Sequence, residues 1–220
     1  RGRVLATFKI KSVLDSARHI TFGADVSINH AAVVCLVDGN FYRAWYKHTV
    51  KKCVDKDDPP AVIGSMVKRS KFTDGSDPAF ADLIDAADIA DWMEFVVTSI
   101  DNRRSQAMKR PLYLAYERML VEATGRVVQL AQLQTMYSWR LFGLGLCRLR
   151  SYDPGAIKMF TAHNGSADKD TMESAVSERW SQDFTRFNSG ASQRISEDLV
   201  DAFAISKMLH TELMLRDGAI

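Results

Sequence analysis

A β-hairpin signal near the start of the chain does most to limit the folds that are open to it. Two runs rich in β-branched and aromatic residues, 31–37 and 40–46, lie on either side of Asp38-Gly39. That dipeptide is typical of the tight two-residue turn that joins antiparallel strands. A third run of the same kind, 19–24, comes just before. The sequence therefore predicts a sheet that begins with three strands, two of them in a hairpin.

Beyond residue 77, helical and strand patterns alternate. Apolar residues recur at helical spacing from Phe80 to Ile100, and Asp77 and Pro78 suit the start of that helix. The same signals predict, in order, a strand over 111–116, a helix over 125–146, a strand over 147–152, a helix from Ser166 to about residue 180, and a last helix capped by Ser196. This order predicts an α/β fold with a mixed β-sheet flanked by helices on both faces.

Three segments are predicted to lie outside these elements. Residues 51–77 are polar and contain Pro59-Pro60, which indicates a long loop or insertion with a short helix near 61–67. Residues 157–160 are expected in a connection, and residues 183–194 in a loop.

Composition limits the class of protein. The 220 residues are 46% hydrophobic and 25% charged, which suits one ordinary globular domain spanning 1–220. No apolar run approaches the roughly 18 residues that cross a bilayer, and no signal-peptide pattern opens the chain. Cys35, Cys53 and Cys147 are far apart and lack metal-ligand spacing. We therefore expect reduced thiols in an intracellular protein with no membrane partner.

Positive charge is gathered in two places, although the net charge is only +2. Lysines and arginines cluster within 47–71 and again within 103–110. Such groups usually form a solvated surface, and the other interpretation is contact with phosphates. Charge alone does not separate the two.

Acidic residues occur at three places where an apolar element would be expected to continue. Asp25 and Glu117 each end a strand-like run, and Asp198 and Asp201 lie about one turn apart on one face of the last predicted helix. Carboxylates at the carboxyl ends of buried strands project into the crevice where α/β sheets bind ligands. If all four converge, they require cations, and oxygen-rich sites suit Mg²⁺ or Mn²⁺.

Each acid also has an ordinary structural interpretation. Asp25 could be a turn residue, Glu117 could pair with Arg118, and the helix dipole alone favours Asp198 near a helix start. Their convergence would decide in favour of a two-metal site for phosphodiester hydrolysis.

The chain resembles the RuvC-like Holliday-junction resolvases, within the wider group of ribonuclease H-like nucleases. The matching motifs, in the family's order, are Gly23-Ala24-Asp25-Val26-Ser27, Glu117, Ile157-Lys158, Gly165-Ser166-Ala167-Asp168-Lys169 and Asp198-Leu199-Val200-Asp201-Ala202. They cover most of the chain. The resemblance implies a ribonuclease H-like mixed sheet and a Mg²⁺-dependent endonuclease, with Mn²⁺ as a substitute.

The resemblance also implies a substrate and roles for individual residues. The enzyme would be a crossover-junction endodeoxyribonuclease of DNA recombination and repair. It would act as a homodimer and cut two strands of a four-way DNA junction symmetrically. By the family pattern the metal ligands are Asp25, Glu117, Asp198 and Asp201. Lys169 would lie near the scissile phosphate and offset its developing charge. Lys158 would contact DNA or the rim of the active site.

The sequence departs from the family after the second acid. Bacterial members carry an aromatic residue there to probe junction bases, whereas this chain has Arg118-Met119-Leu120. Arg118 is then a candidate DNA contact, and Leu120 or Met119 could wedge against bases. The 51–77 loop and the first 18 or so residues are extra to the family pattern.

Two questions stay open at the level of sequence. The 125–146 helix matches the family's dimer helix in position, and Tyr137, Trp139 and Phe142 either pack on a partner or belong to the core. The acids also suit a ribonuclease H-like nuclease acting on RNA–DNA hybrids or flaps, and a non-catalytic junction-binding protein keeps the same fold. A bacterial or phage cytoplasm and a viral or organellar compartment are equally compatible with the sequence.

Overall fold

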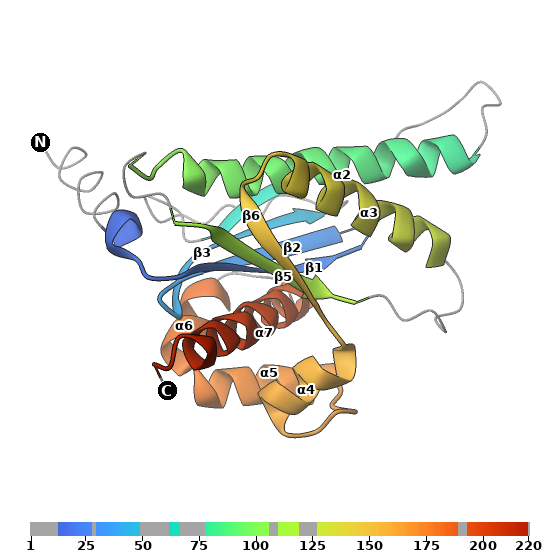
Figure 1. Ribbon diagram of the computed structural model, residues 1–220. Coiled ribbons are helices and arrows are strands. Elements are labelled where there is room, and N and C mark those ends of the chain that lie inside the picture. Colours follow the sequence, from blue (N-terminus) through green and yellow to red (C-terminus); the bar gives the residue numbers. More distant parts are fainter. Residues whose placement is uncertain are drawn as a thin grey trace, which may run out of the picture.

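A mixed six-stranded β-sheet lies between two layers of helices (Figure 1). The computed structural model describes residues 13–27, 30–48, 62–66, 78–105, 110–118, 127–188 and 193–219. Across the sheet the strand order is β4-β3-β2-β1-β5-β6. The strands are β1 (Ile20–Val26), β2 (His30–Val37), β3 (Asn40–His48), β4 (Val62–Met66), β5 (Leu112–Glu117) and β6 (Cys147–Tyr152). The predicted α/β class with helices on both faces is confirmed.

The predicted hairpin joins β2 and β3. Asp38 and Gly39 both adopt left-handed backbone angles, with φ of 48° and 78°, as this tight turn requires. β1 pairs antiparallel with β2 and parallel with β5, and β5 pairs parallel with β6. The carboxyl ends of β1, β5 and β6 therefore meet at one edge of the sheet.

Each face of the sheet has its own apolar core. One face is covered by α2 (Pro78–Asp101) and α3 (Val127–Gly143), which bury Phe22, Trp45 and Tyr137. The other face is covered by the helices α4 (Pro154–Ala162), α5 (Lys169–Arg179), α6 (Ser181–Asn188) and α7 (Gln193–Arg216). Figure 1 shows α7, in red, lying along the sheet with α4 and α5 beside it. No helix within the described ranges has the length and apolar character to cross a membrane.

The sheet and α7 approach each other closely where β1 passes α7, along Thr21 and Gly23. A Cβ placed on Gly23 would lie 2.0 Å from the carbonyl oxygen of Ala202 and 2.4 Å from the backbone nitrogen of Ser206. The hydroxyls of Thr21 and Ser206 lie 3.0 Å apart. Only glycine allows backbone to approach backbone this closely.

Five expectations about elements are wrong, and tertiary contacts explain the first two. The segment expected as a short helix near 61–67 forms β4, because Val62–Met66 pairs parallel with β3 at the edge of the sheet. Residues 183–194, expected as a loop, contain most of α6. Its Phe187 is fully buried against Phe41 and Phe203. This packing stabilises an eight-residue helix, which is too short to be stable alone.

The other three corrections concern helix starts. Residues 157–160 lie in α4, where Asp153 accepts a hydrogen bond from the Gly155 nitrogen and Pro154 begins the helix. α5 is capped by Asp168 rather than Ser166, through the Thr171 nitrogen at 2.9 Å. α7 begins at Gln193, so Ser196 is a buried residue inside the helix and not its cap.

Candidate active site

The sequence-predicted acids are brought to one edge of the sheet by three elements. Asp25 lies in β1 and Glu117 ends the neighbouring parallel strand β5, one step beyond the aligned pair Ala24 and Tyr116. Phe22 and Ala24 face the α2 side, so alternation along the strand turns Thr21, Gly23 and Asp25 toward α7. Asp198 and Asp201 belong to the first half of α7.

The packing of α7 on β1 sets how the acids meet. Ser206 contacts Thr21, and Ala202 lies over Gly23. One further turn toward the start of α7 brings Asp198 to the level of Asp25. The spacing from Ala202 to Asp198 along α7 matches the spacing from Gly23 to Asp25 along β1, because four helical residues rise about 6 Å and two strand residues about 6.6 Å. The Gly-x-Asp and Asp-x-x-Asp-Ala motifs are thus two sides of one interface.

Electrostatics shows that the acids influence one another. Burial raises the pKa of Asp25 well above its ordinary value, and the charges of Asp201, Asp198 and Glu117 raise it further. Burial and the charges of Glu117 and Asp198 raise the pKa of Asp201 to about 6. Burial also raises the pKa of Glu117, to which Asp153 adds. The cluster is destabilised by its own negative charge when it is ionised.

Two lysines from the helices beside α7 face the same cluster. Lys169 is the first residue of α5, and its Nζ lies 2.7 Å from Glu197 Oε2. Its charge lowers the pKa of both Asp25 and Asp201, against the larger upward effects. Lys158, in α4, lowers the pKa of Glu117 and of Asp201. The structure thus brings both predicted lysines to the acids.

The acid cluster fits a hard divalent cation in its chemistry. All four predicted ligands offer carboxylate oxygens, and a cation would relieve the repulsion that raises their pKa values. In the described part of the chain, no three Asp, Glu, His or Cys side chains stand close enough to hold one ion as they are placed.

Known proteins of the same architecture were found by structure and not by sequence. No protein-family model and no curated protein sequence matches the chain. The structure of Thermus thermophilus RuvC aligns with a TM-score of 0.53 at 14% identity, covering 91% of this chain and 97% of that one. RuvC from the same organism in complex with Holliday junction substrate gives 0.53 at 16%, covering 92% and 98%. The fold is that of the RuvC-like resolvases.

A eukaryotic structure shares this RuvC-like fold. The yeast mitochondrial Holliday junction resolvase Ydc2 aligns with a TM-score of 0.53 at 13% identity, covering 96% of this chain and 87% of that one. The likeness therefore extends over nearly the full length of each chain.

Sequence reasoning missed two polar residues that border the acids in this RuvC-like fold. His30 begins β2, and its Nδ1 lies 3.1 Å from Asp198 Oδ2. Glu197 holds the ammonium of Lys169.

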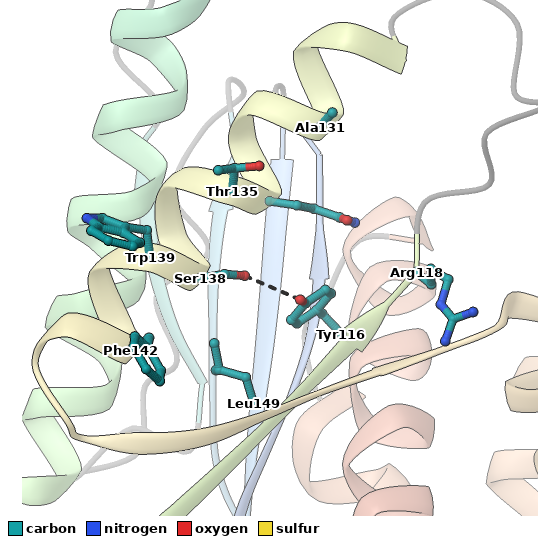
Figure 2. Close-up of a pocket in the computed structure, with 9 residues that line it drawn as sticks. Tyr116, Arg118, Ala131, Thr135, Ser138, Trp139, Phe142 and Leu149 are labelled. Carbon is teal, nitrogen blue, oxygen red and sulfur yellow. Dashed lines mark hydrogen bonds between the residues drawn. The ribbon is translucent and has the colours of Figure 1, made fainter.

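The remaining predicted DNA contacts lie where β5 ends. Arg118 is exposed, and its backbone nitrogen donates to the Tyr152 oxygen at 2.6 Å. Leu120 and Met119 lie outside the described residues. Figure 2 shows Arg118 at one rim of an open pocket of about 540 Å³ between β5, β6 and α3. Trp139 and Phe142 stand along its α3 side.

The question left open for α3 is answered differently for its three aromatic residues. Tyr137 is fully buried and packs edge-on against Tyr116, so of the two alternatives it takes the core one. Trp139 and Phe142 are 76% and 71% exposed. Large apolar side chains gathered at such exposure mark a surface that is suited to a partner.

Proposed function

We propose that this protein is a Mg²⁺-dependent, structure-selective endonuclease that resolves four-way DNA junctions by symmetric phosphodiester hydrolysis. The observation that carries the proposal is the convergence of Asp25, Glu117, Asp198 and Asp201 from β1, β5 and α7. The RuvC-like fold supports the choice of substrate, since one of the similar structures was solved with a Holliday junction substrate.

In this proposal the four carboxylates hold the metal ions. Bound Mg²⁺ supplies an activated water and stabilises the attacking and leaving oxygens of a phosphodiester. The chain contributes a partly buried cluster whose carboxylates lose their protons as cations bind. Gly23 and Ala202 keep α7 close enough to β1 for the carboxylates of both elements to act together.

The two lysines act on the DNA strand in this proposal. Lys169 offsets negative charge that develops on the scissile phosphate, because its ammonium lies beside the acids on the exposed side of the site. Its bond to Glu197 aligns the side chain at the start of α5. Lys158 and Arg118 bind neighbouring phosphates, which would place the strand across the sheet edge.

A homodimer formed through α3 completes the proposal. Two equivalent strands must be cut, and a two-fold dimer presents two equivalent sites to them. Trp139 and Phe142 supply exposed aromatic surface on the outer side of α3, where they line the open pocket of Figure 2. The occupant proposed for this face is a second copy of the chain.

The decisive experiment is a cleavage panel with Mg²⁺. Labelled four-way junction, linear duplex, flap and RNA–DNA hybrid are each incubated with wild-type protein and with Asp25→Asn. We expect paired symmetric nicks in the junction alone, and none with the variant. Asp25→Asn should bind the junction nearly as wild type does, since affinity depends mostly on basic contacts to phosphate.

The other outcomes assign other functions. Cleavage of the hybrid or flap in place of the junction would make the protein a different nuclease of the same fold. Tight junction binding with no cleavage of any substrate would make it a junction-binding protein without catalysis.

A further inference from the structure

We propose that His30 is a positioning residue that holds the Asp198 carboxylate in the orientation needed for metal binding. The inference rests on the proposed function, because it concerns one of the four proposed ligands. It is carried by one contact, in which His30 Nδ1 lies 3.1 Å from Asp198 Oδ2. The Asp198 side chain is 7% exposed and that of His30 22%. The contact is therefore largely shielded from water.

The backbone of His30 is fixed independently of α7. The Ser27 nitrogen donates to the His30 oxygen at 2.8 Å, and the Ser27 hydroxyl donates to the same oxygen at 2.9 Å. His30 also pairs with His48 across β2 and β3. The pairing of β2 with β1 and β3 thus places His30 at the sheet edge, and α7 brings Asp198 to it.

The contact leaves Asp198 able to bind a cation. Nδ1 meets Oδ2 at ion-pair distance without the alignment of a full hydrogen bond. Since an ionised carboxylate only accepts hydrogen bonds, Nδ1 would have to carry the proton to hold Oδ2. Holding Oδ2 fixes the rotation of the carboxylate and leaves Oδ1 for the metal. Metal-binding carboxylates are commonly held this way by outer hydrogen bonds, and losing such a partner typically weakens metal binding by about 10- to 100-fold.

Lys169, the nearby lysine of the family motif, does not orient the Asp198 carboxylate. Its ammonium bonds to Glu197, the residue just before Asp198. The two adjacent acids of α7 therefore have different partners. Glu197 aligns a lysine proposed to face DNA, and Asp198 is itself aligned by His30.

Manganese affinity tests the inference without relying on cleavage. Binding of Mn²⁺ to the full chain is measured by electron paramagnetic resonance for wild type, His30→Ala, His30→Asn and His30→Gln. An asparagine amide nitrogen can occupy the position of Nδ1, whereas a glutamine amide reaches the position of Nε2. We expect affinity about 10- to 100-fold weaker for alanine and glutamine, and close to wild type for asparagine.

A second set of variants separates positioning from direct ligation and from general instability. In an Asp198→Asn background, His30→Ala should cause no further loss of Mn²⁺ affinity, since its effect passes through Asp198. His163→Asn is the matched control, an exposed histidine whose left-handed backbone suits asparagine. It should bind Mn²⁺ as wild type does. Melting curves without metal identify any variant that is merely unfolded.

Each outcome has one meaning. Unchanged affinity in a folded His30→Ala, or an equal further loss in the Asp198→Asn background, overturns the positioning role. A loss in His30→Asn as large as in His30→Ala also overturns it and makes His30 a direct ligand. If the wild-type protein binds no Mn²⁺, or if Asp198→Asn leaves the Mn²⁺ affinity unchanged, the proposed metal centre is wrong. This inference is then wrong with it.

Discussion

Gly23 and Ala202 bring the backbones of β1 and α7 into direct contact, with 2.0 Å between the carbonyl oxygen of Ala202 and the place where a Gly23 side chain would begin. Gly23 lies two residues from Asp25 on the same face of β1, and Ala202 follows Asp201 in α7. The distance between two of the proposed ligand-bearing elements is thus set by the absence of a side chain.

Replacing Gly23 with alanine should therefore displace α7. The methyl group would meet backbone atoms that cannot rotate away, so we expect a loss of about 1–3 kcal/mol or more in the free energy of unfolding. Junction cleavage should fall further than stability alone explains. The measurement is urea unfolding beside cleavage at a temperature where the variant is folded. Gly143→Ala is the control, because nothing lies within 4 Å of its added methyl group; a similar loss there would count against the interface.

Removing the Asp201 charge should stabilise the metal-free protein at neutral pH. The folded-state pKa of about 6 lies above the ordinary 3.8, so the folded state holds its proton more tightly than the unfolded chain does. Stability is therefore lost as pH rises from about 4 to about 6. Asp201→Asn should gain about 1–3 kcal/mol at pH 7.5 and almost nothing near pH 3.5. Thermal unfolding in EDTA at both pH values measures this, and equal gains at both would contradict it.

Divalent metal should raise the melting temperature of wild-type protein at pH 7.5. An ion at a hundred times its dissociation constant adds about 2.7 kcal/mol to the free energy of unfolding, which corresponds to several degrees for a chain of this size. Mn²⁺ and Mg²⁺ should both act, EDTA should reverse the effect, and Asp25→Asn should lose most of it. A gain of the same size in that variant would place the ion elsewhere.

Lys169→Ala should slow cleavage more than it weakens junction binding. The ammonium is proposed to act on charge that develops during the reaction, so its removal affects the rate of the bound complex. Single-turnover cleavage and binding in Ca²⁺ are compared for this variant and for Lys158→Ala. We expect Lys158→Ala to weaken binding and reduce its salt dependence. Equal losses in rate and binding for Lys169→Ala would remove its role in the reaction.

Trp139→Ser combined with Phe142→Ser should convert the proposed dimer to monomers. Both side chains are exposed in the single chain, so the fold should keep its stability while the association constant falls. Sedimentation equilibrium at micromolar concentration reports the oligomeric state. Exposed Phe95, on α2, provides the control as Phe95→Ser. A wild-type protein that is monomeric with and without junction DNA would contradict the proposal.

The elements that sequence predicted well are those whose signals are local. The Asp38-Gly39 turn and the strand over 147–152 are examples, because turn chemistry and β-rich composition act within a few residues. β4 and α6 were missed, since pairing with β3 and the burial of Phe187 between Phe41 and Phe203 come from distant parts of the chain.

The candidate site likewise has residues with a local sequence signal and residues that depend on distant contacts. Asp25, Glu117, Asp198 and Asp201 stood out because carboxylates are unusual at the ends of apolar runs, and the structure brings them together. His30 and Glu197 carry no such anomaly. Their roles depend on which side chain each one meets across the site, and spacing along the chain does not encode that.

Thr21 and Ser206 bond to each other although they are 185 residues apart in sequence, and this has a consequence for synthesis. Strand β1 leaves the ribosome well before α7 does, since it precedes α7 by about the whole described chain. Contacts of such long range form late in folding, so a nascent or prematurely terminated chain carries Asp25 without Asp198 and Asp201. The proposed centre is thereby withheld from DNA until translation has passed α7.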